Sequence, residues 1–119
     1  MTTRADLKRL GQLTGMMLKI RLAELHRAAA QRAECEDRLK ALQLPPTNPE
    51  GLEGAAAELA HLNYQRWADM RREEINRQLA QRTVTWLEAV ETARAAFGKD
   101  QALGKIASLL PARKPGSAG

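Results

Sequence analysis

The sequence predicts an all-α protein: a long antiparallel two-helix coiled-coil hairpin in which the second helix is the longer. Three observations support this fold class. Ala, Leu, Glu, Lys and Arg make up 67 of the 119 residues, a balance typical of long helices, whereas aromatic residues are only 3%. An eleven-residue apolar repeat runs along the second half of the chain, and a proline-rich segment divides the two halves.

The apolar repeat has large or small apolar side chains at fixed positions on one helix face. Its seven members are Tyr64, Ala68, Ile75, Leu79, Trp86, Val90 and Phe97. Eleven residues at about 3.67 residues per turn bring a side chain back to nearly the same face. The repeat therefore predicts one long apolar stripe that needs a partner helix. A fainter version in the first half, the pairs Leu7/Gly11, Leu18/Leu22 and Ala29/Ala33, indicates that the first half supplies that partner.

The first helix is predicted over residues 4–43. The segment Thr3-Arg-Ala-Asp6 has the spacing of a capping box, in which a hydroxyl and a carboxylate satisfy the exposed amides of the first turn. Pro45 and Pro46 lack the amide hydrogens that a helix needs. Residues 44–48 are therefore predicted to form the turn.

The second helix is predicted over residues 49–97. The segment Asn48-Pro49-Glu50 supplies a capping side chain, a proline at the first helical position and an acid near the positive helix end. Gly98-Lys-Asp100 predicts a break or a kink, after which Asp100 can cap a short helix over about residues 100–110. Residues 111–119 have no periodicity and are predicted to be disordered.

A short turn fixes how two antiparallel helices pair. With the turn near Pro46, Thr3 lies opposite about Val90, and the second helix extends beyond its partner at the carboxyl end. This overhang carries five apolar side chains larger than alanine: Phe97, Leu103, Ile106, Leu109 and Leu110. We expect the overhang either to dock into another protein or to fold back over Leu7 and Leu10, and its apolar content favours docking.

Charge and composition narrow the classes of function. The net charge of +5 and the pI near 9.9 favour an acidic partner, whether protein, nucleic acid or membrane surface. Residues 34–58 are acidic and residues 1–33 basic, so the turn and the opposite end differ in sign. A single cysteine, Cys35, fits a reducing cytosol. The first residues lack the apolar core of a signal peptide, and no apolar run has membrane-spanning length, so a cytoplasmic protein is expected.

No catalytic motif stands out, so the protein is predicted not to be an enzyme and to bind no cofactor. The chain has no glycine-rich phosphate loop and no cysteine pair for zinc. Glu58 and His61 have the spacing of di-iron helix bundles, but that architecture needs two such motifs and further glutamates, so no metal is predicted. Acids interleave with the arginines around Trp67, which favours ion pairs within the helix over a nucleic-acid strip.

One segment points to a family. The run Trp67-Ala-Asp-Met-Arg-Arg-Glu-Glu-Ile-Asn-Arg-Gln-Leu-Ala80, followed by Ala95-Ala-Phe-Gly-Lys99, resembles the second helix of the flagellar FliJ and YscO-type proteins, small coiled-coil components of type III export machines. The resemblance implies a stalk that inserts into the ring of a hexameric export ATPase and couples it to the export gate or to export chaperones. It implies a cytoplasmic protein that reaches the inner membrane only through such a partner complex.

Carried over to this chain, the resemblance assigns partner-binding residues. The ring is expected to contact Leu7, Leu10, Phe97, Leu103 and Ile106, with Lys99 and Lys105 steering the encounter. The flank around Trp67 is expected to contact a second partner. Two alternatives remain: a basic coiled coil associated with nucleic acid, and a homodimeric scaffold that buries its stripes in a four-helix bundle. Phosphate binding weakens steeply with salt, whereas apolar docking does not.

Overall fold

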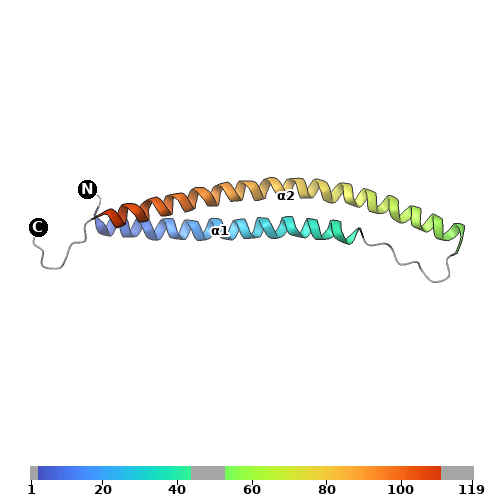
Figure 1. The fold of residues 1–119 in the computed structure, drawn as a ribbon, viewed down its shortest axis with the longest axis horizontal. Coiled ribbons are helices and arrows are strands. Elements are labelled where there is room, and N and C mark those ends of the chain that lie inside the picture. The colour runs from blue at the N-terminus through green and yellow to red at the C-terminus, as the bar shows by residue number, and fades with distance from the viewer. Residues whose placement is uncertain (1–2, 44–52, 111–119) are drawn as a thin grey trace, which may run out of the picture. The chain divides into compact units, whose positions relative to one another are not determined.

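The computed structural model describes residues 3–43 and 53–110, which form an all-α helical hairpin of two helices. Helix α1 spans Arg4–Ala41 and helix α2 spans Ala55–Leu109 (Figure 1). The chain divides into two compact units. Unit 1 comprises residues 1–26 and 88–119, and unit 2 comprises residues 27–87. In each unit a segment of α1 lies beside an antiparallel segment of α2. The predicted fold class, including the longer second helix, is confirmed.

The start of α1 has the predicted capping box. The amide of Thr3 donates to Oδ2 of Asp6 at 3.2 Å, and the amide of Asp6 donates to Oγ1 of Thr3 at 3.1 Å. These two bonds satisfy donors that the first helical turn leaves without a backbone acceptor. The helix ends at Ala41, close to the predicted end at about residue 43, and Leu42 and Gln43 form a hydrogen-bonded turn.

Helix α2 begins at Ala55 and not at residue 49. Gly54 precedes it with φ of +62°, a left-handed conformation that glycine adopts at little cost, and the carbonyl of Gly54 accepts from the amide of Glu58 at 3.1 Å. Glu58 lies in the first turn, where an acid is favoured by the helix dipole. The predicted turn over 44–48, the predicted restart at Asn48-Pro49-Glu50 and the predicted disordered tail over 111–119 lie outside the described residues.

The predicted break at Gly98-Lys-Asp100 is wrong, because α2 continues without interruption to Leu109. A glycine inside a helix costs about 1 kcal/mol relative to alanine, too little to end a helix that packs on a partner. Asp100, expected to cap a new helix, instead accepts a hydrogen bond across the helix pair from the hydroxyl of Thr14 at 2.8 Å. Residues 100–110 are therefore the last turns of α2.

The predicted pairing register is also wrong. It would place Leu79 opposite Thr14, whereas the structure places Asp100 there. In unit 2, Nε of Arg32 donates to Oγ1 of Thr83 at 3.1 Å, and Nη2 of Arg72 donates to the carbonyl of Leu42 at 3.1 Å. The prediction failed because it assumed a tight turn near Pro46, whereas α2 begins only at Ala55.

As a consequence, the overhang lies at the other end of α2. In unit 2 the first turns of α2 extend past the end of α1 (Figure 1). In unit 1 the last turns of α2 lie beside the start of α1: one groove is lined from α1 by Leu7 and from α2 by Leu103 and Ala107. Residues 97–109 therefore form no overhang: they continue α2 directly and lie beside the start of α1.

The face of α1 toward α2 repeats every seven residues and not every eleven. Its buried or half-buried positions alternate by four and three residues: Leu7, Gly11, Thr14, Leu18, Arg21 and Leu25 in unit 1, then Ala28, Arg32, Cys35, Leu39 and Leu42 in unit 2. A strict seven-residue repeat is the signature of a coiled-coil seam. Leu22 and Ala33, which the faint eleven-residue pattern included, are exposed.

The matching face of α2 changes its repeat between the units. In unit 2 it follows the predicted eleven-residue pattern through Tyr64, Ala68, Arg72, Ile75, Leu79, Thr83 and Trp86. In unit 1 it continues through Val90, Ala93, Ala96, Asp100 and Leu103, which approach a seven-residue spacing. Six of the seven predicted stripe positions are buried or half-buried. Phe97 is the exception, with 50% of its surface exposed, because the inner face passes through Ala96.

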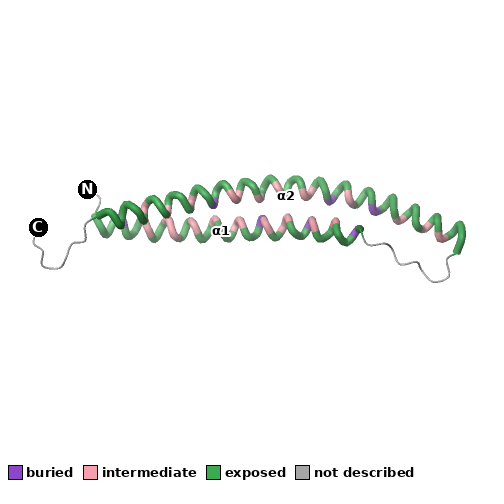
Figure 2. The backbone as a smooth tube through the Cα atoms, viewed as in Figure 1, coloured by how far each residue is buried: buried purple, intermediate pink, exposed green. Residues whose placement is uncertain are grey.

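The apolar core of unit 2 is a small cluster. Cys35, Leu42, Ala68 and Ile75 are buried, and Leu39, Tyr64 and Leu79 pack against them. In unit 1 only Leu7 and Ala93 are buried hydrophobic residues among those described. Figure 2 shows the buried positions of each unit on the sides of the helices that face each other. No described helix is long and apolar enough to cross a membrane.

Candidate partner-binding surfaces

The residues predicted to contact a partner ring fall into two groups in unit 1. Leu7 is buried and Leu103 half-buried, so both belong to the contact between the helices. Leu10, Phe97 and Ile106 keep 45%, 50% and 50% of their surface exposed. Lys99 and Lys105 are exposed as well, and neither forms an ion pair with another described residue. In the observed register, the apolar side chains of Leu10, Phe97 and Ile106 therefore remain accessible to a partner on unit 1.

A terminal groove lies where α1 begins and α2 ends. It encloses about 380 Å³ and is lined by Arg4, Leu7, Lys8, Gly11, Asp100, Leu103, Gly104, Ala107 and Leu110. Leucine and alanine side chains make it largely apolar, and the bases from α1 lie along it. A Cβ atom added at Gly11 or Gly104 would meet no heavy atom within 4 Å, so the two glycines leave open space in the groove. The groove is therefore wide enough to receive side chains of another molecule.

A second, lateral groove runs between the helices farther along unit 1. It encloses about 230 Å³ and is lined by Leu13, Thr14, Met17, Arg21, Thr92, Ala95, Ala96 and Lys99. The alanines of α2 have short side chains, and the larger side chains of Leu13 and Met17 form the opposite wall. Sequence reasoning missed this groove. Leu10, Leu13, Met17 and Ile20 have helical spacing, but this spacing is equally compatible with a face that packs on the second helix.

Trp67 lies in unit 2, on the part of α2 that extends past α1. Its surface is 54% exposed, and its ring centroid lies 5.8 Å from that of Tyr64 at an interplanar angle of 42°. Trp86 is half-buried and lies under the guanidinium of Arg32, whose Cζ is 5.1 Å from the ring centroid.

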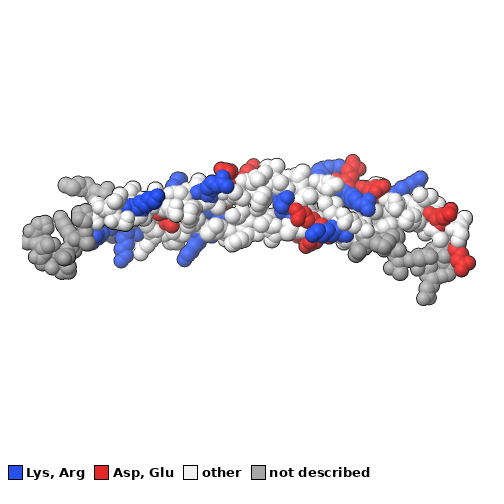
Figure 3. Space-filling model, viewed as in Figure 1, with Lys and Arg blue, Asp and Glu red and all other residues white. Residues whose placement is uncertain are grey.

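Two of the arginines around Trp67 form ion pairs within α2, as the sequence predicted, whereas Arg66 and Arg77 form none with a described residue. Arg72 contacts Asp69 at 2.7 Å, and Arg71 contacts Glu74 at 3.6 Å. Both pairs join residues three apart on one helix. Acidic and basic side chains also alternate along the surface in Figure 3, and acidic atoms gather at the end of unit 2 where α2 begins. The face of unit 2 drawn there is mixed in charge, unlike the continuous basic surface that phosphate backbones favour.

The described residues contain no group of three or more His, Cys, Asp or Glu side chains that could hold a metal ion. His61, the candidate metal ligand, is exposed and has its Nε2 atom 3.3 Å from Nε2 of Gln65. Cys35 is a free, buried thiol in the cluster of unit 2.

No protein-family model matches the chain, and no curated protein or solved structure matches it either.

Proposed function

We propose that this chain is a non-catalytic helical-hairpin adaptor that binds a protein partner through unit 1. The observation that carries the proposal is the exposed apolar surface next to the terminal groove, where Phe97 and Ile106 are each half exposed and Leu109 is 82% exposed. Apolar surface of this kind, bordered by charged side chains, is a mark of protein interfaces.

The resemblance to FliJ and YscO-type proteins supplies a specific form of the proposal. In that form the partner is the ring of a hexameric export ATPase, catalysis belongs to that ATPase, and the export gate or export chaperones are further partners. Lys99 and Lys105 then act mainly on the rate of encounter, because exposed bases attract an acidic surface over about one Debye length.

The test measures ATP hydrolysis by the export ATPase of the organism that encodes the chain, with and without the full chain. Deleting residues 97–119 is not a clean test, because residues 97–109 pair with α1. Point variants are better. Phe97→Gln with Ile106→Gln should reduce stimulation at least about tenfold, whereas Leu62→Gln with Val84→Gln, which are 55% exposed in unit 2, should not.

Two outcomes would contradict the proposal. If the intact chain does not stimulate the ATPase and instead binds DNA or RNA with steep salt dependence, the nucleic-acid alternative is favoured. If replacing Glu53 and Glu58 by glutamine, at the start of α2, removes stimulation while the Phe97 and Ile106 variants keep it, the partner binds unit 2 and not unit 1.

A further inference from the structure

We propose that the lateral groove of unit 1 is a second binding site, which takes an acidic amphipathic helix of another protein. This site differs from the terminal surface of the proposed function, since its walls are Leu13 and Met17 on α1 and Ala95 and Ala96 on α2. The two proposals share Leu10 and Lys99, so they are tested separately with variants of other residues.

The shape of the site fits a helix. Leu10 and Ile20 lie three residues before Leu13 and three after Met17, so the four side chains form one continuous stripe on α1. The stripe spans about 15 Å, or about three helical turns. All four side chains are exposed to between 45% and 58%. Across the groove the alanines are short enough for a third helix to approach closely, and so the groove offers three-helix packing that this chain leaves incomplete.

The charges around the site select an acidic occupant. Arg9 lies four residues before Leu13 on α1, and Lys99 lines the groove from α2. Neither base forms an ion pair with another described residue. The acids nearest the stripe on α1 are already engaged, since Asp6 caps the helix and Glu24 contacts Arg21 at 3.1 Å.

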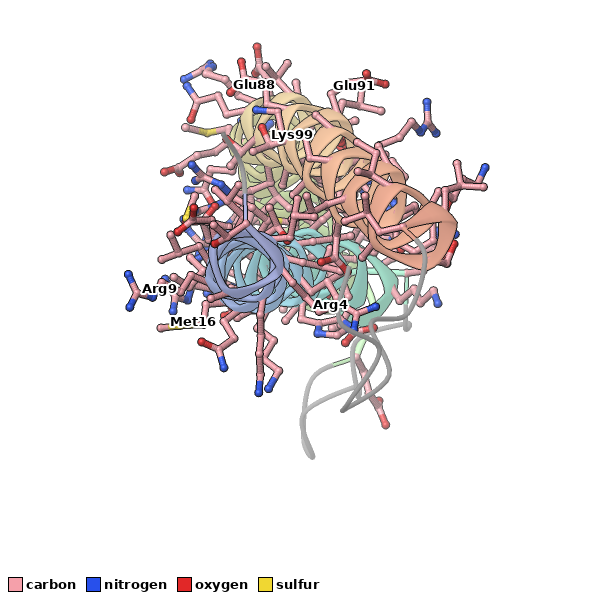
Figure 4. The ribbon with its side chains drawn as sticks, turned by 90° about the vertical axis from the view of Figure 1, so that its left-hand side faces the viewer. Arg4, Arg9, Met16, Glu88, Glu91 and Lys99 are labelled. Carbon is pink, nitrogen blue, oxygen red and sulfur yellow. The ribbon has the colours of Figure 1, made fainter. Side chains whose placement is uncertain are left out.

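Two acids of α2, Glu88 and Glu91, lie near this part of unit 1. Figure 4 shows Arg9 and Met16 pointing outward from α1, whereas Glu88 and Glu91 point away from α1 on the far side of α2. Glu91 is also paired with Arg94 at 3.2 Å. Glu88 forms no ion pair with a described residue and lies eleven residues before Lys99, on nearly the same face of α2. The two uncommitted bases, Arg9 and Lys99, outnumber this one acid, and the net positive charge attracts carboxylates that flank an apolar helix face.

A second copy of the chain is a poorer occupant. If the α1 stripes of two copies met across a two-fold axis with the helices antiparallel, Leu13 would face the partner's Met17 and Arg9 would face the partner's Arg21. With the helices parallel, each base would face the same base of the second chain. Like charges directly opposite each other are unfavourable, and each chain carries a net charge of +5.

The test uses the full chain and two designed peptides of about 18 residues, or about five turns. Both peptides carry leucines at the spacing of a helix face; one is flanked by glutamates and the other, the control, by lysines. Fluorescence anisotropy should show that the glutamate peptide binds at least about tenfold more tightly than the lysine peptide. The difference should shrink as salt rises from 50 to 500 mM.

Variants identify the site. Leu13→Gln and Met17→Gln should each weaken binding of the glutamate peptide about tenfold. Leu59→Gln and Met70→Gln are matched controls in unit 2, with 60% and 72% exposed surface, and should leave binding unchanged. Arg9→Gln and Lys99→Gln should each weaken binding at low salt. Phe97→Gln with Ile106→Gln should leave peptide binding intact, which separates this site from the proposed ATPase contact.

Three results would overturn the inference. The first is equal binding of both peptides, which removes the selection for an acidic helix. The second is no binding of either peptide to a chain that sedimentation velocity shows to be monomeric. The third is a dimer that Leu13→Gln or Met17→Gln dissociates, since the groove would then be filled by a second copy. Circular dichroism of each variant checks that the helices remain intact.

Discussion

The two units of this hairpin differ in what they do with their apolar side chains. Unit 2 buries Ala68 and Ile75 to 1% and 2% exposure in a cluster with Cys35 and Leu42. Unit 1 buries only Leu7 and Ala93 among its described hydrophobic residues and leaves a stripe of large ones exposed on α1. Both units leave large hydrophobic side chains exposed, but unit 2 also has a buried apolar cluster, whereas unit 1 has a continuous exposed stripe on α1.

Polar contacts divide in the same way. In unit 2 the guanidinium of Arg32 lies over Trp86 and donates to Thr83, whose hydroxyl donates in turn to the carbonyl of Leu79 at 2.7 Å. In unit 1 the single hydrogen bond between side chains of the two helices, among the described residues, joins Thr14 and Asp100. Unit 1 is thus held by fewer specific contacts, and we expect it to open more readily.

The largest test of this comparison is truncation of a stripe residue in each unit. Ile75→Ala should lower the free energy of unfolding by about 2–4 kcal/mol, because it removes a buried side chain from a packed cluster. Ile20→Ala, at a residue 50% exposed in unit 1, should cost less than about 0.5 kcal/mol. Urea denaturation followed by circular dichroism measures both. Equal costs would mean that the two units are packed alike.

The sequence predicted some features of the two units correctly and others not. Composition and the proline-rich segment were sufficient to predict the hairpin fold. The eleven-residue repeat correctly predicted the inner face of α2 from Tyr64 to Val90. The register was not predictable in this way, because it depends on pairs far apart in sequence, such as Thr14 with Asp100. No local pattern encodes such a pair.

The candidate surfaces were predicted only in part for the same reason. Phe97, Ile106, Lys99 and Lys105 are accessible as expected. The predicted reason for their accessibility, an unpaired overhang, was wrong, because these residues lie on a segment of α2 that pairs with α1. The lateral groove was not predicted because an apolar stripe at helical spacing has the same sequence pattern whether it packs within the chain or faces a partner. Only the pairing of Leu7 and Gly11 with α2 shows that Leu13 and Met17 lie to one side.

A second test concerns the polar contact of unit 1. Thr14→Val removes the donor and leaves the half-buried carboxylate of Asp100 unpaired, which should cost about 1–2 kcal/mol. Adding Asp100→Leu should recover most of that loss, because two apolar groups replace the polar pair. Thermal unfolding of both variants gives the coupling. If the double variant is no better than the single one, Thr14 stabilises unit 1 by another route.

A third test uses the glycines of unit 1. Gly11→Ala and Gly104→Ala should each stabilise the chain by about 0.5–1 kcal/mol, because alanine is the better helix former and its Cβ meets no atom within 4 Å. Hydrogen exchange should show the added protection in residues 4–26 and 88–109. A loss of stability would indicate that another chain or segment approaches these glycines closely in solution.

The smallest expected effect separates two surface ion pairs that look alike in sequence. Arg94 and Glu91 in unit 1 are 71% and 73% exposed, so Arg94→Gln should change stability by less than about 0.3 kcal/mol. Arg72 in unit 2 pairs with Asp69 in the same way, but it also donates to the carbonyl of Leu42 just beyond the end of α1. That second bond ties the two helices together and satisfies an acceptor that no further helical turn reaches. Arg72→Gln should therefore cost about 1 kcal/mol, and Asp69→Asn, which spares the bond to Leu42, should cost much less. Equal effects of the two arginine variants in chemical denaturation would show that the contact with Leu42 adds nothing to the stability of unit 2.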